Sequence, residues 1–215
     1  MNGLPSGESP RPGRPRSFDR AEALVIAMEL FWRKGFAATS IAELCEAMGI
    51  ASPSLYAAFG GKEALYREAI SRYEQLQVPK IWGGMDDMPT AKQAIGRLLR
   101  QSAEVLSAPC HPRGCMVTLA YVGTPEQTEI DSFVRGLRGQ AMHRLRQRLL
   151  RGIEDGDVPP HADVSALARF YLALQQAMSV QARDGASQEE LARIADLGMQ
   201  AWDGLVGSAP PLDRC

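Results

Sequence analysis

Residues 39–62 read TSIAELCEAMGIASPSLYAAFGGK, and this stretch predicts two short helices joined by a tight turn. The first helix is expected over residues 40–48, where apolar side chains recur at steps of three and four residues: Ile41, Leu44, Cys45 and Met48. Ser40 and Glu43 have the spacing of a capping box, in which each side chain satisfies a free backbone N–H group. Gly49 should end the helix, because glycine adopts the left-handed conformation without a steric penalty.

A second helix is predicted directly after this turn. Ser52 is expected to cap it, and Pro53 to occupy its first helical position, where the missing N–H group had no partner in any case. Leu55 and Phe59 are four residues apart and should both point into a core. Glycines at positions 60 and 61 end this helix, and a further one is predicted over residues 61–77.

These elements resemble the N-terminal domain of the tetracycline-repressor (TetR) family of bacterial transcription regulators. The likeness extends over residues 18–73, about a quarter of the chain, and is far more specific than a generic helix-turn-helix pattern. Residues 49–66, GIASPSLYAAFGGKEALY, are similar to the family's turn, recognition helix and following lysine, and residues 21–36 to its first helix. The resemblance implies an all-α fold, in which a three-helix helix-turn-helix domain precedes a helical ligand-binding and dimerisation domain.

The same resemblance implies which residues contact DNA. Tyr56 and Lys62 should hold phosphates, with hydroxyl or backbone N–H contacts from Thr39 and Ser40. Base reading falls to short side chains: Ala42, Ala51, Ser52, Pro53, Ser54 and Ala57. Many relatives carry a bulky aromatic residue or histidine where this chain has Ala58. Because no Arg, Asn or Gln stands on the exposed face, we expect readout through thymine methyl groups, serine hydroxyls, water and DNA shape.

Residues 1–17 are rich in Pro, Gly and Ser and carry the run RPGRPR. A segment of this composition cannot bury a core and is expected to be disordered when free. It resembles minor-groove hook peptides, in which proline keeps the chain extended and arginines enter a narrow groove, here Arg14 and Arg16. A basic arm and a tail that makes no contact with DNA both remain open at this point.

The composition fits a cytoplasmic protein without a membrane span. The chain has 215 residues and a formal net charge of −1, and its basic N-terminus lacks an apolar signal region. Its four cysteines are too few and too scattered for a disulfide scaffold. Residues 1–75 are formally neutral, so nonspecific DNA affinity should be modest and strongly dependent on salt.

The rest of the chain, residues 79–215, is predicted to be a helical effector-binding and dimerisation domain. Residues 64–78 would link it to the helix-turn-helix domain at residues 18–63. Apolar periodicity places its helices at residues 90–108, 115–122, 126–154, 163–183 and 187–206. The arginines of the third of these helices are expected to form a solvated face: Arg135, Arg138, Arg144, Arg146 and Arg148.

The last two helices are apolar on more than one side, which requires more than one packing partner. One side can meet the protomer and the other a twin chain, and the family dimerises through its last two long helices. The expected interface residues are Leu167, Phe170, Leu174, Leu191, Ile194, Trp202 and Leu205. A larger monomeric core is the alternative. A homodimer would recognise a pseudo-palindromic operator, and the family's usual behaviour is repression relieved by a small-molecule effector.

The effector should be apolar or aromatic, and its pocket would be lined by Trp82, Met116, Leu119, Phe133, Tyr171, Gln175 and Met178. No cofactor is expected.

The run CHPRGC favours a second hypothesis, a thiol- or metal-responsive regulator that senses through Cys110, His111 and Cys115. The sequence has no G-x-S-x-G elbow, phosphate loop or H-E-x-x-H motif, so the chain is predicted not to be an enzyme.

Overall fold

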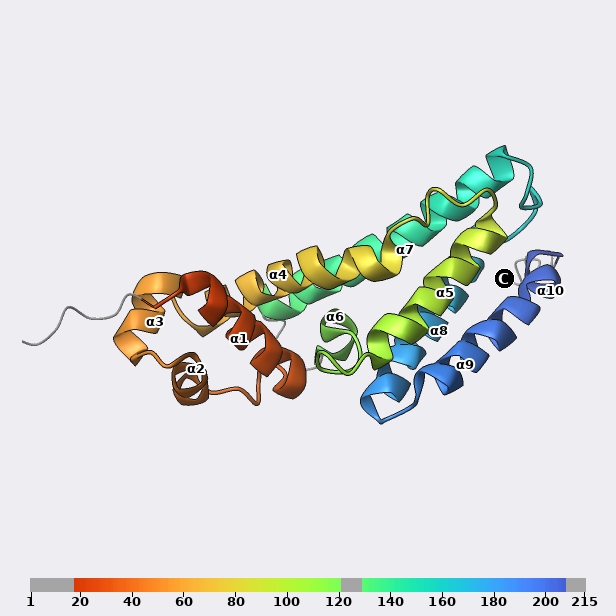
Figure 1. The fold of residues 1–215 in the computed structure, drawn as a ribbon. Helices are drawn as coiled ribbons and strands as arrows, with labels where there is room; N and C mark the ends of the chain where they lie inside the picture. The colour runs from red at the N-terminus through yellow and green to blue at the C-terminus, as the bar shows by residue number, and fades with distance from the viewer. Residues whose placement is uncertain (1–17, 121–128, 208–215) are drawn as a thin grey trace, which may run out of the picture.

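The computed structural model describes residues 18–120 and 129–207, and the regular structure within these ranges is helical (Figure 1). Its helices are α1 (Arg20–Lys34), α2 (Ile41–Met48), α3 (Ser52–Phe59), α4 (Lys62–Trp82), α5 (Ala91–Ser107), α6 (Met116–Leu119), α7 (Glu129–Glu154), α8 (Val164–Arg183), α9 (Gln188–Gln200) and α10 (Trp202–Gly207). The predicted all-α fold is confirmed. In the described ranges, no helix is long and apolar enough to cross a membrane.

Helices α1–α3 and the first half of α4 form a small unit at one end of the molecule, here called the head (Figure 1). Each of its helices contributes buried side chains to one core: Phe31, Leu44, Leu55, Phe59 and Tyr66. The capping box of Ser40 and Glu43 forms as predicted, and Gly49 ends α2 in the left-handed conformation at φ +66°. Local sequence signals therefore specify the turn between α2 and α3.

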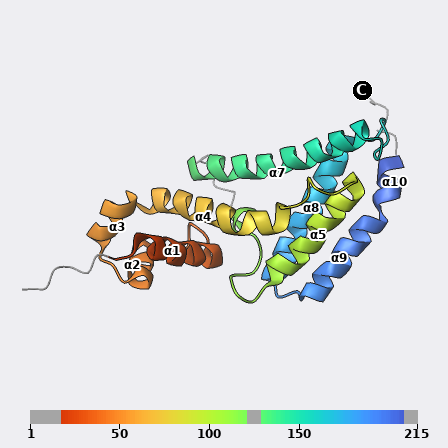
Figure 2. The same cartoon turned by 45° about the horizontal axis from the view of Figure 1, so that its top comes forward.

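Helix α4 belongs to two cores. Its first half is buried in the head, while Ile81 and Trp82 pack in the second core, among α5, α7, α8 and α9. We call this second unit the body; Figure 2 shows α4 running from the head into it, with α7 alongside. The helix was predicted to end near residue 77 but continues through Pro79 to Trp82. Pro79 lies in the last turn of α4, where its missing N–H group removes one helical hydrogen bond. Burial of Ile81 and Trp82 offsets that loss.

Side-chain caps fix where the body helices begin. Thr90, Asp163 and Ser187 each accept a hydrogen bond from a backbone N–H group in the first turn of α5, α8 and α9, respectively. Helix α5 packs against both α8 and α9, and α7 packs against α8. The predicted apolar stripes of these helices thus meet in one core.

Two predicted helices differ from the structure. The helix expected over residues 187–206 is divided at Ala201 into α9 and α10, and the bend accompanies packing of Trp202 against Tyr171, with ring centroids 5.6 Å apart. The helix expected over residues 115–122 spans only Met116–Leu119. The predicted start of the long helix at residue 126 lies outside the described residues.

The arginines of α7 do not form one solvated face, so that prediction was wrong for three of them. Arg138 donates hydrogen bonds to the carbonyl oxygens of Val117, Thr118 and Ala120 at 2.7–3.2 Å. Arg144 donates to the Trp82 carbonyl at 3.0 Å, and the buried Arg148 donates to that of Met88. These guanidinium groups bind carbonyls at helix ends and in loops, which lack partners within a helix.

A polar contact also joins the body to the head. Arg183, the last residue of α8, donates to the carbonyl oxygens of Trp32 and Arg33 at 2.7 and 2.9 Å, at the C-terminal end of α1. It also donates to the Arg113 carbonyl, and the Trp32 indole donates to the Gly114 carbonyl at 3.0 Å. The end of α1 is therefore anchored to the end of α8 and to the loop before α6.

The protein is predicted to lose stability when a larger residue replaces Gly152, in the last turns of α7. A Cβ atom there would lie 2.5 Å from Asp157 Oδ1, 2.7 Å from Val158 Cγ2 and 2.9 Å from the Cβ of Ala91. We expect Gly152→Ala to lower the free energy of unfolding by about 1–3 kcal/mol through overpacking, measured by urea denaturation.

Gly139, on the same helix, is the matched control, because an added Cβ would meet no atom within 4 Å. Gly139→Ala should raise the free energy of unfolding by up to about 1 kcal/mol through helix propensity. Equal stability of the two variants would show that Gly152 is not packed as described.

Candidate functional site

The N-terminal end of α3 exposes short side chains. Ala51 occupies the cap position, and no side chain caps the helix, so the prediction of Ser52 as the cap was wrong. Pro53 is the second helical residue, and Ala51, Ser52 and Pro53 are all exposed. The chain reaches Ala51 in an extended conformation, which places Ser52 inside the helix. Backbone N–H groups at this end thus lie beneath small side chains.

Most of the other predicted DNA contacts in the head are accessible. Ala42 and Ala57 are exposed, Ser54 is half-buried, and Tyr56 is 53% exposed, an unusual state for a large ring. Inward-facing Leu55 is fully buried and therefore fixes which side of α3 faces outward. Ala58 packs against the head core. Arg14 and Arg16 lie outside the described residues.

Thr39 does not offer its hydroxyl to a partner molecule. Its side chain is fully buried, and the hydroxyl donates to the Gly35 carbonyl at 2.7 Å. The predicted hydroxyl contact between Thr39 and DNA therefore does not fit the structure, because the hydroxyl already binds the carbonyl after α1. Ser40 is exposed, and its hydroxyl belongs to the capping box of α2.

Two lysines of the head lie at helix ends, Lys34 at the end of α1 and Lys62 at the start of α4. Lys34 pairs with Glu43, and this contact, together with hydrogen bonds from Ser40, lowers the pKa of Glu43 from 4.5 to about 2. The Lys62 ammonium lies 4.3 Å from the centre of the Phe36 ring. Partial burial lowers the pKa of Lys62, and the charge of Glu43 opposes that effect. Lys62, the first residue of α4, is thus held beside Phe36, just after the end of α3.

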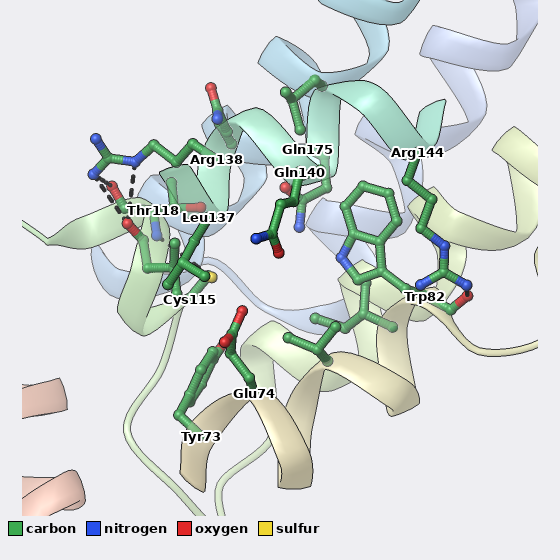
Figure 3. Close-up of a pocket in the computed structure, with 16 residues that line it drawn as sticks. Tyr73, Glu74, Trp82, Cys115, Thr118, Leu137, Arg138, Gln140, Arg144 and Gln175 are labelled. Atoms are coloured by element: carbon green, nitrogen blue, oxygen red, sulfur yellow. Dashed lines mark hydrogen bonds between the residues drawn. The ribbon is translucent and has the colours of Figure 1, made fainter. Parts of the chain in front are cut away.

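A cavity of about 170 Å³ lies between α4, α6, α7 and α8 (Figure 3). Of the predicted pocket residues, Trp82 and Gln175 line it. Met116 and Leu119 instead line a different hollow, beside the C-terminal end of α1. Tyr171 and Met178 are buried in the body core, and Phe133 packs under the guanidinium of Arg67 at 5.1 Å.

Several residues of this cavity were not predicted from the sequence: Tyr73, Glu74, Leu137, Arg138, Gln140 and Arg144. All of them come from α4 and α7, the two helices that cross between head and body. One available signal was Glu74, a carboxylate next to the inward-facing Tyr73 in an otherwise well-formed apolar stripe. The others depend on how α7 packs over α4, which periodicity does not reveal.

The CHPRGC segment has structural contacts. The Cys115 thiol accepts a hydrogen bond from the Thr118 backbone N–H group as the cap of α6, and His111 stacks on Trp32 with ring centroids 4.8 Å apart. Cys110 is exposed. Across residues 18–120 and 129–207, no group of three or more His, Cys, Asp or Glu side chains is placed to hold a metal ion.

The predicted interface residues divide into two sets. Leu167, Leu191 and Trp202 are at most 3% exposed within one chain, so they belong to the protomer core rather than to a surface. The others retain exposed area: Phe170, Leu174, Ile194 and Leu205. The structure adds Val180 and Leu197, which are 44% and 64% exposed on α8 and α9.

The sequence is similar to known transcription regulators along nearly its whole length. Residues 23–69 match the family model described as bacterial regulatory proteins, tetR family. The chain is 35% identical over 196 residues to the HTH-type transcriptional repressor ComR of Escherichia coli K12, covering 90% of this chain and 93% of ComR. It is 30% identical over 191 residues to the repressor BdcR of the same strain, covering 88% and 92%.

A solved structure shares both fold and sequence. A cysteine-substituted variant of the TetR family regulator CifR, bound to 26-bp operator DNA, superposes with a TM-score of 0.83 at 40% identity. The match covers 88% of this chain and all of that one.

Glu43 is predicted to titrate near pH 2. Because its pKa is lowered in the folded state, its contribution to stability is complete above pH 4.5 and is lost as the pH falls toward 2. An NMR titration should find this value. Lys34→Met should raise the pKa of Glu43 toward 4.5, because the Lys34 hydrogen bond is the largest cause of the shift.

The neighbouring Arg33→Met is the control for this titration, since Arg33 pairs with Glu29 at 2.8 Å and not with Glu43. It should leave the Glu43 pKa unchanged. A Glu43 that titrates near 4.5 in the unmodified protein would mean that Lys34 does not hold it in solution.

Proposed function

This chain belongs to the TetR family of bacterial transcription regulators, and we propose that it is a homodimeric repressor released from its operator by a small molecule. The observation that carries the proposal is the 35% identity to a repressor over 90% of the chain. The head, which exposes the start of α3, agrees with it. A DNA-binding regulator needs no catalytic group. We therefore propose that the chain is not an enzyme and, because its operator would lie on bacterial genomic DNA, that it acts in the cytoplasm.

The head supplies a reading helix that can lie close to bases. Short first residues let the backbone of a helix lie close to the bases in the major groove, and Ser52, Pro53 and Ser54 are short. Tyr56, further along α3, and Lys62, at the start of α4, are proposed to hold phosphates. Since α3 carries no Arg, Asn or Gln, we propose that specificity rests on thymine methyl groups, serine hydroxyls, water and DNA shape. Two of the three arginines in residues 1–17, Arg14 and Arg16, are proposed to enter the minor groove.

The body supplies a dimer interface. Exposed and half-buried apolar side chains on α8 and α9 are the proposed contact surface: Phe170, Leu174, Val180, Ile194 and Leu197. Two helices from each chain would form a four-helix interface about a two-fold axis. Two reading helices about 34–36 Å apart would then address half-sites one DNA turn apart, which requires a pseudo-palindromic operator.

The cavity between α4, α6, α7 and α8 is the proposed effector site. Its α4 wall continues into the head core, and α8 anchors the end of α1 through Arg183. A ligand that favours a different packing of α4 or α8 would therefore move the head, with a coupling of about 1–3 kcal/mol. Sensing through Cys110, His111 and Cys115 is not favoured, because Cys115 and His111 already make the structural contacts described above.

Operator binding tests the proposal directly. Gel-shift or anisotropy assays on DNA upstream of the chain's own gene should give specific binding that weakens with salt. We expect Lys62→Ala to weaken specific and nonspecific DNA alike and to reduce the salt slope by about 1, because a phosphate contact is lost. Ser54→Ala should instead change the preferred sequence.

Lys80→Ala is the matched control for Lys62→Ala, because Lys80 is an exposed lysine on the same helix but at its far end. It should leave affinity and salt slope unchanged. Equal effects of the two substitutions would remove the proposed phosphate contact, and absence of any operator shift at low salt would remove the proposed function.

Leu197→Asp tests the interface. A carboxylate at this 64% exposed position would be buried between two chains, so sedimentation should show monomers, and operator affinity should fall. Leu150→Asp is the control, because Leu150 is 39% exposed on α7, outside the proposed interface. A dimer that survives Leu197→Asp would contradict this interface.

A further inference from the structure

We infer that the cavity binds an organic cation, an amine on a small apolar body, with Glu74 as its counter-charge. This inference rests on the proposed function of the same cavity as the effector site.

Glu74 is the negative charge in the cavity wall. In Figure 3 its carboxylate points from α4 into the cavity, toward Gln140 of α7. Among the described residues, no hydrogen bond or ion pair is found for this carboxylate. Partial burial raises the pKa of Glu74, because an ionised carboxylate loses water there. A bound cation would return the lost electrostatic stabilisation.

The surrounding walls suit an apolar ammonium compound. Trp82 is 7% exposed and lines one side. The face of an indole ring attracts cations, and the Arg144 guanidinium already lies 5.8 Å from the centre of this ring. Val78, Ile81 and Leu172 supply apolar surface for the body of the ligand. Gln140 and Gln175 bring amide oxygens that can accept hydrogen bonds from an ammonium group.

Two arginines also line the cavity and keep their positive charges, but each directs N–H groups to other partners. Arg138 donates to three backbone carbonyls, at distances of 2.7–3.2 Å. Arg144 donates to the Trp82 carbonyl at 3.0 Å and to the Asp86 carboxylate at 3.2 Å. Figure 3 shows both guanidinium groups at opposite edges, turned toward these carbonyls. An anionic ligand would compete with these contacts for the guanidinium groups and would also face Glu74.

The volume limits the size of the ligand. The cavity measures about 170 Å³, close to an engineered apolar cavity of ~150 Å³ that accommodates benzene. One aromatic ring with a short amine chain therefore fits, whereas a fused multi-ring compound would require the helices to separate.

Three compounds with one carbon skeleton test the charge preference: phenylpropylamine, phenylpropanol and phenylpropanoate. Calorimetry with the full-length protein should give the tightest binding for the amine, by about 10-fold or more over the alcohol, as expected for a charge-assisted hydrogen bond. Glu74→Gln keeps the side-chain shape and should remove this advantage. Glu104→Gln, at an exposed carboxylate on α5, should preserve it.

Tightest binding of phenylpropanoate, an amine preference that survives Glu74→Gln, or failure of all three compounds to bind would each overturn the inference. Operator release is recorded separately. Amine binding that depends on Glu74 but leaves operator affinity unchanged supports the cation site and removes the effector role. If phenylpropanoate alone releases the protein from operator DNA, the effector role is preserved and the cation site is overturned.

Discussion

Helix α4 cannot shift without disturbing two cores. Its Leu65 and Tyr73 are buried in the head, and its Ile81 and Trp82 are buried in the body. Close-packed cores resist small displacements and instead rearrange between discrete packings. Residues of the same helix, Tyr73 to Trp82, form one wall of the cavity. Whatever occupies that cavity therefore contacts a helix whose other half packs with α3 in the head core.

Arg183 adds a second, polar link between the same units. Its guanidinium occupies the C-terminal end of α1, where free carbonyls and the helix dipole favour a positive charge. Helix α8, which carries Arg183, also lines the cavity through Gln175 and bears part of the proposed dimer surface. The proposed effector site, the proposed dimer surface and the head are thus joined through two helices, α4 and α8, without a flexible linker among the described residues.

The sequence predicts the head well because its signals are local. Capping residues, the left-handed Gly49 and the Leu55–Phe59 spacing all act within one turn of the chain. Periodicity also finds the body helices, but it identifies an apolar face without saying what covers it. Leu167, Leu191 and Trp202 share faces with exposed residues and were therefore expected at a dimer surface, although they fill the protomer core. The partners of Thr39, Arg138 and Arg183 are carbonyl groups, which every residue carries, so no sequence pattern identifies them.

Hydrogen exchange of the full-length protein, with and without operator DNA, tests the coupling between head and cavity most directly. Linkage is reciprocal, so operator binding must alter the cavity if cavity occupancy alters operator binding. We expect changed protection at residues 39–62 and also along α4 as far as Trp82 and at the end of α8. Protection that changes only at residues 39–62, with α4 and α8 unaffected, would contradict the coupling.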